Sequence, residues 1–410
     1  MNKNRLMKGV CLVAAASILS SLQTAMAEEE EGPSWSISGW INEAVSSWDD
    51  GIDSGTAQLS DNGTTLGSRI TFAGSTKLKG NFLTTAGFEV ILEPLSDNTP
   101  LIFSNQDTFG AEGNGASIGV LGTSAHFGGN WGKITLGLQS MPTDNIAVLA
   151  DPSLTLWSGI SPVFRGNGFA IRGLGPGAGN TSWGSFLNCL TSNELTGIGG
   201  IGIDCNGIYR NGIRYDLPAF GDVSVAIGYA NDDIVDIAAK YNGKLGNLKT
   251  VFHIGYANNS DGGSVVGATG GADNLQIQLG LMHEDTGLFG TLALQFESAD
   301  NAIAGSGDDT DAYWFKGGIK RQFSSVGDTA FYFEYATYND QYGSGNADGI
   351  TGSEVQHFGL SVDQYFGSKL IVYLKYENLS LDVEGDVVAQ ATYGAADDLS
   401  FLTLGVTYFF

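Results

Sequence analysis

The sequence predicts an all-β fold, a transmembrane antiparallel up-and-down β-barrel of about 16 strands. Three observations support this prediction: an N-terminal export signal, alternating segments that continue to the last residue, and connections that are alternately short and long. A strand between two unlike surroundings changes side-chain character at every second residue, whereas a helix repeats about every 3.6 residues. The periodicity therefore indicates strands, and the connections indicate how they follow one another.

The first 27 residues have the pattern of a secretory signal peptide, which would leave residues 28–410 as the barrel. Lys3, Arg5 and Lys8 precede an apolar stretch, Gly9 to Ser20, and Ala25-Met26-Ala27 fits a cleavage site. The apolar stretch is too short to span a membrane as a helix. We therefore expect an exported protein.

The composition narrows the classes of exported protein. Outside the signal peptide, 44 acidic residues stand against 16 basic ones (19 in the chain less the three above), a formal charge of −28. This balance argues against nucleic acid as a partner, because phosphate binding needs clustered Lys and Arg. The aromatic content argues against disorder, and no stretch of this part reaches about eighteen consecutive apolar residues. A secreted all-β protein and an outer-membrane barrel remain.

Sixteen segments alternate in character. They are residues 35–48, 66–77, 82–93, 123–129, 133–139, 207–217, 222–230, 234–242, 248–257, 274–283, 288–297, 312–320, 329–338, 355–364, 370–380 and 399–410. Long connections rich in Asp, Gly, Asn and Ser fall at 49–65, 94–122, 140–206, 258–273, 298–311, 339–354 and 381–398, and short turns lie between them. Short turns at one end and long loops at the other are typical of outer-membrane barrels.

Charged residues identify the face that meets lipid. In residues 331–335, Glu334 lies opposite three aromatic residues, and in residues 370–376, Lys375 lies opposite Leu and Tyr side chains. A Lys or Arg on the lipid face costs roughly 2–4 kcal/mol at the bilayer midplane, so the apolar face should meet lipid and the other a wet lumen. A soluble sandwich also alternates, but sixteen meandering strands exceed what open sheets usually reach.

The chain alternates up to its last residue. Leu402, Leu404, Val406, Tyr408 and Phe410 share one face of the final segment. Because free termini usually fray, an apolar terminus should be held in a sheet. We expect Tyr408 and Phe410 to close the barrel against the first strand and to take part in its assembly.

At several places the chain resembles the Gram-negative general porins. Residues 68–74, followed by Gly87-Phe88-Glu89, are similar to their second and third strands, residues 133–139 to the strand entering their constriction loop, and residues 210–218 to the strand leaving it. The terminal Phe410 resembles their assembly signal. The resemblance spans the chain after the signal peptide and implies a homotrimer of sixteen-stranded barrels, each with its third loop folded into the pore. This family commonly has Arg where the chain has Gln139, which weakens the basic wall.

The connection 140–206 is the third long loop and the predicted constriction. An insertion of this length is uncommon without a role, and its apolar residues argue against the alternative, a disordered surface loop. Cys189 and Cys205 are the only cysteines outside the signal peptide, and both lie here. We predict a disulfide formed in the oxidising periplasm, rather than two buried thiols.

No motif indicates chemistry, and we expect no enzymatic activity, no cofactor and no metal. Residues 197–202 match G-x-G-x-x-G but lack the strand and helix that a nucleotide site needs. The four His residues have no metal-ligand spacing, and no G-x-S-x-G motif occurs. A barrel hydrolase stays an alternative, because catalytic groups can converge from distant strands.

These features predict a porin of the Gram-negative outer membrane, a water-filled channel for passive diffusion of small hydrophilic solutes and ions. Its other partners would be outer-membrane lipid and lipopolysaccharide. The alternatives are a substrate-specific channel and a structural or adhesive barrel.

The charges of the lumen give the predicted selectivity. Arg69, Lys77, Lys133, Arg210 and Arg214 form one arc of the wall beside Gln139, and the loop offers Asp144, Asp151, Glu194 and Asp204 against Arg165 and Arg172. Opposed charges across a narrow passage create a transverse field. Because the chain is acidic overall, we expect a mild cation preference that fades at high salt.

Overall fold

The computed structural model describes residues 33–59, 67–96, 116–159, 166, 168–176, 181–187, 189, 202–205, 209–231, 233–259, 271–299, 309–342 and 349–410. The predicted signal peptide, residues 1–27, lies outside these ranges. The strands are β1 (Ser34–Asp49), β2 (Ser54–Leu59), β3 (Arg69–Lys77), β4 (Thr85–Ser96), β5 (Ala116–Gly129), β6 (Gly132–Ser140), β7 (Tyr209–Asp216), β8 (Val223–Ala230), β9 (Ile234–Leu245), β10 (Leu248–Asn259), β11 (Ala272–His283), β12 (Leu288–Ala299), β13 (Asp309–Ser324), β14 (Gly327–Asn339), β15 (Ile350–Phe366), β16 (Leu370–Gly385) and β17 (Leu399–Phe409). The helices are the 3-10 helix η1 (Trp183–Phe186) and α3 (Val387–Tyr393).

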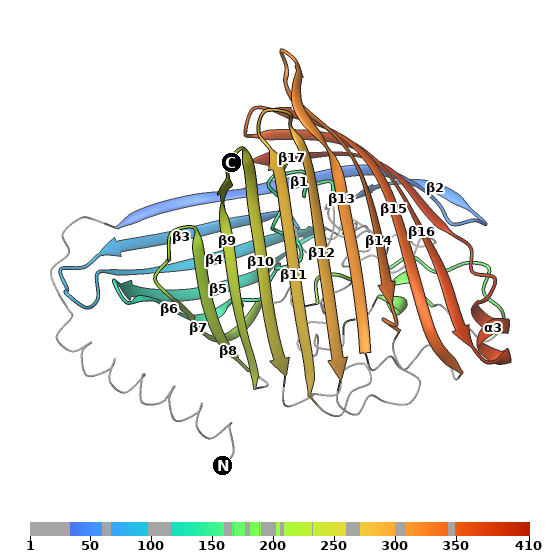
Figure 1. Ribbon diagram of the computed structural model, residues 1–410, viewed down its shortest axis with the longest axis horizontal. Coiled ribbons are helices and arrows are strands. Elements are labelled where there is room, and N and C mark those ends of the chain that lie inside the picture. The colour runs from blue at the N-terminus through green and yellow to red at the C-terminus, as the bar shows by residue number, and fades with distance from the viewer. Residues whose placement is uncertain are drawn as a thin grey trace.

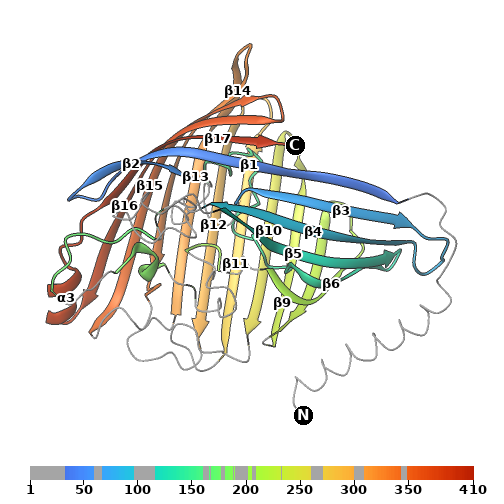
Figure 2. The ribbon, with the colours of Figure 1, turned by 180° about the vertical axis from the view of Figure 1, so that it is seen from behind.

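The strands form a closed antiparallel barrel (Figures 1 and 2). From β3 onward each strand pairs with the next in sequence, and β17 pairs back with β1, where Trp40 lies opposite Phe409. β1 pairs with β3 along its first half and with β2 along its second half. Since β2 and β3 share one place among the 17 strands of the sheet, the barrel has 16 strand positions. The predicted fold is confirmed, and β2 is an additional strand within the connection 49–65 that was predicted to be a loop.

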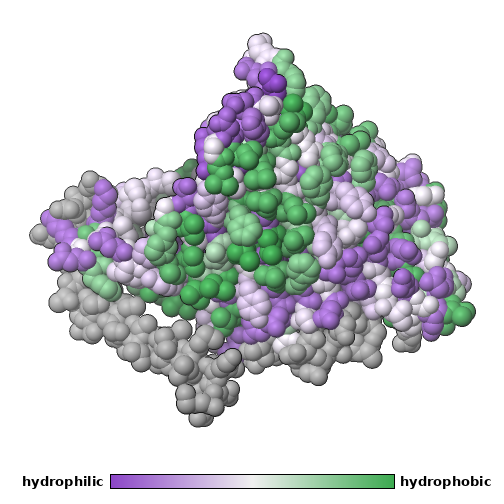
Figure 3. Space-filling model, viewed as in Figure 1, coloured by the Kyte–Doolittle hydropathy of each residue, from purple (hydrophilic) through white to green (hydrophobic). Residues whose placement is uncertain are grey.

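The two faces of the wall differ as the alternation predicts. On β14, Phe331, Phe333 and Tyr335 are exposed on the outer face, while Glu334 between them is fully buried inside. On β16, Leu374 and Tyr376 are likewise exposed and Lys375 is buried. Apolar residues cover the middle of the outer wall, and hydrophilic residues gather toward its loop end (Figure 3). Apolar side chains therefore face lipid and charged side chains face the interior, which is the arrangement with the lower free-energy cost.

The last long connection is more ordered than the sequence indicates. β16 runs on to Gly385, and α3 follows directly, within the stretch predicted to be a loop. The Asp386 carboxylate caps this helix by accepting hydrogen bonds from the backbone N–H groups of Val388 and Ala389, at 2.8 and 3.0 Å. Among the described residues, neither helix has the length and apolar character needed to cross a membrane.

The interior is filled unevenly. Phe169, Trp183 and Phe186 of the 140–206 connection lie in one apolar core with inward side chains of β12 to β17. Phe169 meets Phe401 of β17 edge to face, with ring centroids 5.0 Å apart. Across the barrel, on β3 to β9, many inward side chains remain in contact with water. The inward side chains that meet water therefore lie on the β3–β9 side.

Candidate functional site

Residues 141–159, named here the belt, lie against the inner face of the wall. At its start, the Thr143 N–H and hydroxyl both donate to Asp236 Oδ2 of β9, at 2.9 and 2.7 Å. Further along, the Ala150 N–H donates to Gln278 Oε1 of β11, at 2.6 Å. Because Asp236 and Gln278 both occupy the inward face of their strands, the belt runs inside the barrel.

An ion pair fixes the middle of the belt. Lys316 Nζ of β13 donates to Asp151 Oδ2 at 2.7 Å, and neither side chain is exposed to solvent. Burial by itself raises the pKa of Asp151, but the Lys316 charge and hydrogen bonds from Lys316 and Ser153 outweigh it and hold the pKa below its ordinary value of 3.8. Asp151 is therefore ionised at neutral pH and holds the belt on β13.

The far end of the belt is bound to a buried cluster of charges. Lys375 Nζ donates to the Ser158 carbonyl oxygen at 2.6 Å and forms ion pairs with Glu334 and with Glu377, the latter at 2.9 Å. His357 Nε2 lies 3.6 Å from Glu334 Oε1. Glu334, His357 and Glu377 are close enough together to hold a metal ion. The ammonium group of Lys375, however, already binds both carboxylates.

The predicted disulfide is confirmed. Cys189 and Cys205 are joined, with an S–S distance of 2.02 Å. The bridge lies in the same connection as η1, whose Phe186 packs edge to face on Tyr393 of α3 at 5.4 Å. The later part of the connection is thus held by a covalent bond and an apolar core, and the belt by polar contacts.

The predicted basic arc lies on the inner face of β3, β6 and β7. Lys77 and Lys133 are exposed, Arg210 and Arg214 are partly exposed, and Arg69 is buried. Acidic neighbours that the sequence analysis did not select accompany them. Arg69 pairs with Glu93 at 3.5 Å, while Asp216 accepts from Arg214 at 2.7 Å and lies 3.6 Å from Lys133.

Lys240 of β9 is a further inward cation that the sequence analysis did not select. It lies on the same face as Asp236 and opposite Ile237, so the alternation of β9 contains the signal that would have found it. Lys240 also lies within electrostatic reach of Asp144 at the start of the belt.

The loop charges take different places from those expected. Burial raises the pKa of Asp144, and the charges of Lys240, Arg69 and Arg214 oppose the rise, so Asp144 faces the basic arc. Asp151 and Asp204 are buried and do not border open water. Arg172 pairs with Asp50 at the end of β1, at 2.9 Å.

Gln139, Arg165 and Glu194 are the remaining predicted positions. Gln139 is buried rather than water-facing, and its amide donates to the backbone oxygens of Thr135 and Gly212 at 3.0 and 3.1 Å. It therefore ties β6 to β7. Arg165 and Glu194 lie outside the described residues.

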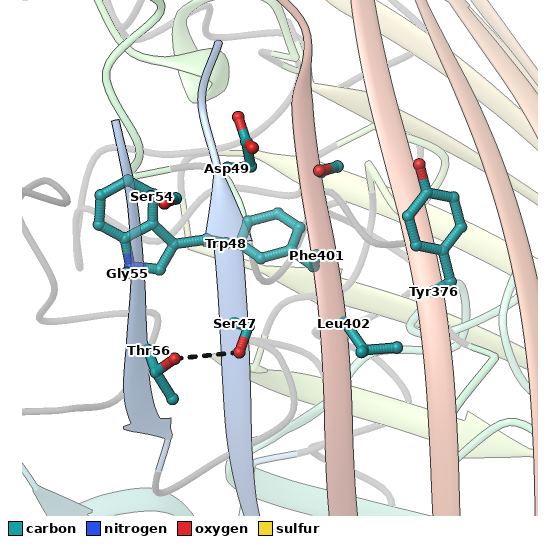
Figure 4. Close-up of a pocket in the computed structure, with 10 residues that line it drawn as sticks. Ser47, Trp48, Asp49, Ser54, Gly55, Thr56, Tyr376, Phe401 and Leu402 are labelled. Carbon is teal, nitrogen blue, oxygen red and sulfur yellow. Dashed lines mark hydrogen bonds between the residues drawn. The ribbon is translucent and has the colours of Figure 1, made fainter. Parts of the chain in front are cut away.

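A separate pocket of about 450 Å³ opens on the outer surface between β1, β2, β16 and β17 (Figure 4). The Ser47 and Thr56 hydroxyls share a hydrogen bond of 3.0 Å there, beside Tyr376 and Leu402. These side chains belong to the outward face, whereas Trp48 and Phe401, which also line the pocket, turn inward and pack on Phe169.

A family profile described as Gram-negative porin matches residues 11–384. The chain belongs to the Gram-negative porin family. No curated protein matches it. Among solved structures it is similar to the anion-selective porin from Comamonas acidovorans, with 19% identity, a TM-score of 0.56, and coverage of 92% of this chain and 100% of that one.

A second similar structure is a loop-deletion mutant of OmpT, an outer membrane protein of Vibrio cholerae. It has 11% identity and a TM-score of 0.53, over 93% of this chain and 100% of that one. The trimer form of OmpT gives 12% identity and a TM-score of 0.51, over 93% of this chain and 100% of that one. At these identities the solved structures show the fold. The family places the porin in the outer membrane.

Proposed function

We propose that this porin is a passive diffusion channel for small hydrophilic solutes and ions. The observation that carries the proposal is the division of the interior, with the belt and the apolar core on one side and water-facing charges on the other. Lys77, Glu89 and Lys133 are exposed on the inner face of β3 to β6. A charged wall of this kind keeps passing solutes hydrated, and the diameter of the lumen sets the size of solute that can pass.

The finer proposal is a mild cation preference. Acidic residues are exposed around the loop end of the barrel, namely Asp49, Asp53, Asp309, Glu384 and Asp398. Such a rim raises the local cation concentration within a Debye length of about 10 Å at 0.1 M salt. In the arc, by contrast, acidic partners offset much of the basic charge.

The opposite preference is the second candidate. The Comamonas acidovorans porin is described as anion-selective. Lys133, Arg210, Arg214 and Lys240 would favour the same behaviour here if the arc, rather than the rim, sets the field.

Recording in planar lipid bilayers tests both levels of the proposal. Purified protein should give stepwise ion currents, whereas a structural or adhesive barrel would give none. A reversal potential measured across a potassium chloride gradient should have the sign of a cation preference at low salt and approach zero at high salt. An anion preference at low salt would refute the role of the acidic rim. Saturable block by one solute would instead favour a substrate-specific channel.

The assembly is also part of the proposal. We expect a homotrimer surrounded by outer-membrane lipid and lipopolysaccharide, because the family resemblance implies it and a trimer form of OmpT has the same fold. Cross-linking in intact membranes followed by electrophoresis without heating tests this. A monomer under all conditions would refute it.

A further inference from the structure

The water-facing side of the belt is apolar. Within residues 141–159, the exposed side chains are Leu149 and Leu154, at 40% and 56%. Pro152, Trp157 and Asn145 are partly exposed, and the other residues of the belt are buried. A single exposed leucine is ordinary on a protein surface, but here four of the five water-facing residues are apolar.

The water-facing side of the belt is apolar because of how the belt is anchored. Its polar side chains are used on the wall side, where Asp151 binds Lys316 and Ser158 donates to Asp363. Thr155 is fully buried, and its hydroxyl donates to Asp151 Oδ2 at 3.3 Å. Because the belt lies on the inner wall, side chains that turn away from the wall enter the lumen.

Leu154 is held in a conformation that leucine rarely adopts. Its φ is +60°, in the left-handed region. Contacts on both sides keep it there, since the Tyr365 hydroxyl donates to the Leu154 carbonyl oxygen at 2.9 Å and Lys320 Nζ donates to that of Ser153 at 2.8 Å. Strain that the surroundings maintain at an exposed apolar residue is a pattern found at functional sites.

The strip ends in an aromatic cluster. The Trp157 ring lies 4.9 Å from that of Trp40 on β1 and 4.8 Å from that of Phe409 on β17. The guanidinium group of Arg69 lies over the Trp40 ring at 4.6 Å. The apolar surface therefore continues to a cation of β3, the strand that pairs with β1 and places Arg69 opposite Trp40.

We propose that Leu149, Pro152, Leu154 and Trp157 form an apolar strip that contacts the hydrocarbon part of small amphiphilic solutes in transit. The charged arc across the passage keeps the polar part of such a solute solvated. The strip lies inside a closed barrel, so a solute in the lumen, and not a protein or lipid surface, reaches it. This inference rests on the proposed diffusion function and names the solutes that it favours.

Isosteric amino acids test the strip. L-Valine and L-threonine have the same shape and charge. L-Leucine and L-asparagine are also nearly alike in shape and charge. We would reconstitute the purified porin in liposomes and measure isosmotic swelling with each solute. The wild type should admit valine about two to four times faster than threonine, as expected from contact with one methyl group. The ratio for leucine over asparagine should be larger.

Two variants assign the effect. In L149N/L154N the ratio should fall toward one, while swelling with arabinose stays at the wild-type rate or rises. Asn tolerates a positive φ, so this exchange suits position 154. L245N, which alters a leucine that is 61% exposed at a short turn, should keep the wild-type ratio.

The outcomes separate the two proposals. Swelling with both members of each pair at equal rates in the wild type would overturn the strip and leave the diffusion function standing. A wild-type ratio that L149N/L154N does not change would also overturn it. The absence of swelling with every solute would overturn the diffusion function itself. Because the wild-type ratios are informative alone, the test does not depend on the variants assembling.

Discussion

Replacing Asp151 by Asn should release the belt from the wall without opening the barrel. The substitution keeps the shape of the side chain but leaves Lys316 buried without its charged partner. Removing one member of a buried pair typically costs about 3–5 kcal/mol. The Trp314 and Tyr332 rings, 5.1 and 5.4 Å from Lys316 Nζ, remain available to the ammonium group. If they recover about 1 kcal/mol, the belt loses about 2–4 kcal/mol of docking free energy.

Hydrogen exchange measures this loss directly. A loss of that size raises the population of the released belt by about 30- to 700-fold, at about 1.4 kcal/mol per tenfold. Amides of the belt, including the Ala150 N–H bound to Gln278, should exchange faster by a comparable factor where local opening limits exchange. Strand amides of β13 and β14 should keep their wild-type rates, and single-channel currents should become noisier.

Two further variants serve as controls for the ion pair. K244M breaks the pair of Lys244 and Glu284, which is 2.7 Å long but largely exposed, and should leave belt exchange unchanged. D151L/K316M removes both charges and should recover part of the loss, because a buried pair can often be replaced by apolar residues. Wild-type exchange of the belt in D151N would show that the ion pair does not hold it.

Three other predictions follow from the same contacts. Deleting Phe410, whose N–H and carbonyl oxygen both bond to the Gly39 backbone, should reduce the assembled porin in the outer membrane, measured by heat-modifiable electrophoresis; wild-type levels would contradict this. Replacing Cys189 and Cys205 by Ala removes roughly 3 kcal/mol of constraint from the loop; it should change channel noise more than barrel melting temperature, and the reverse order would contradict this. The pKa of Asp151 is depressed in the folded state, so its contribution to docking is complete above pH 3.8 and is lost as the pH falls below that value. If the exchange of the belt amides, relative to their intrinsic rate, is already faster at pH 5 than at pH 7, the assignment is refuted.

The wall could be predicted from the sequence because its signal is local. Glu334 and Lys375 stand among outward aromatic and aliphatic residues, and that alternation alone places both inside. Closure at Phe410 follows from the same period. The strand β2 gave no comparable signal, because the sequence at 49–65 has the composition of a single long polar connection.

The roles of the loop charges could not be read in the same way. Asp151 and Lys316 are 165 residues apart, and no pattern along the chain says that they meet. Asp151, assigned to the pore by its charge, is an anchor, whereas Leu149 and Leu154 of the same loop face water. Inside a barrel, a loop whose polar side chains bond to a polar wall buries those side chains and leaves its apolar side chains exposed to water.

Because the barrel is filled unevenly, its circumference does not determine the width of the space left inside it. Sixteen strand positions fix the circumference that faces lipid, but the belt, which runs along the inner wall from β9 to β16, and the apolar core on β12 to β17 occupy part of the interior. What crosses the membrane is then decided by a crescent between that filling and β3 to β9. Sequence change in one loop can widen or narrow this space, or alter its chemistry, while the surface presented to lipid stays the same.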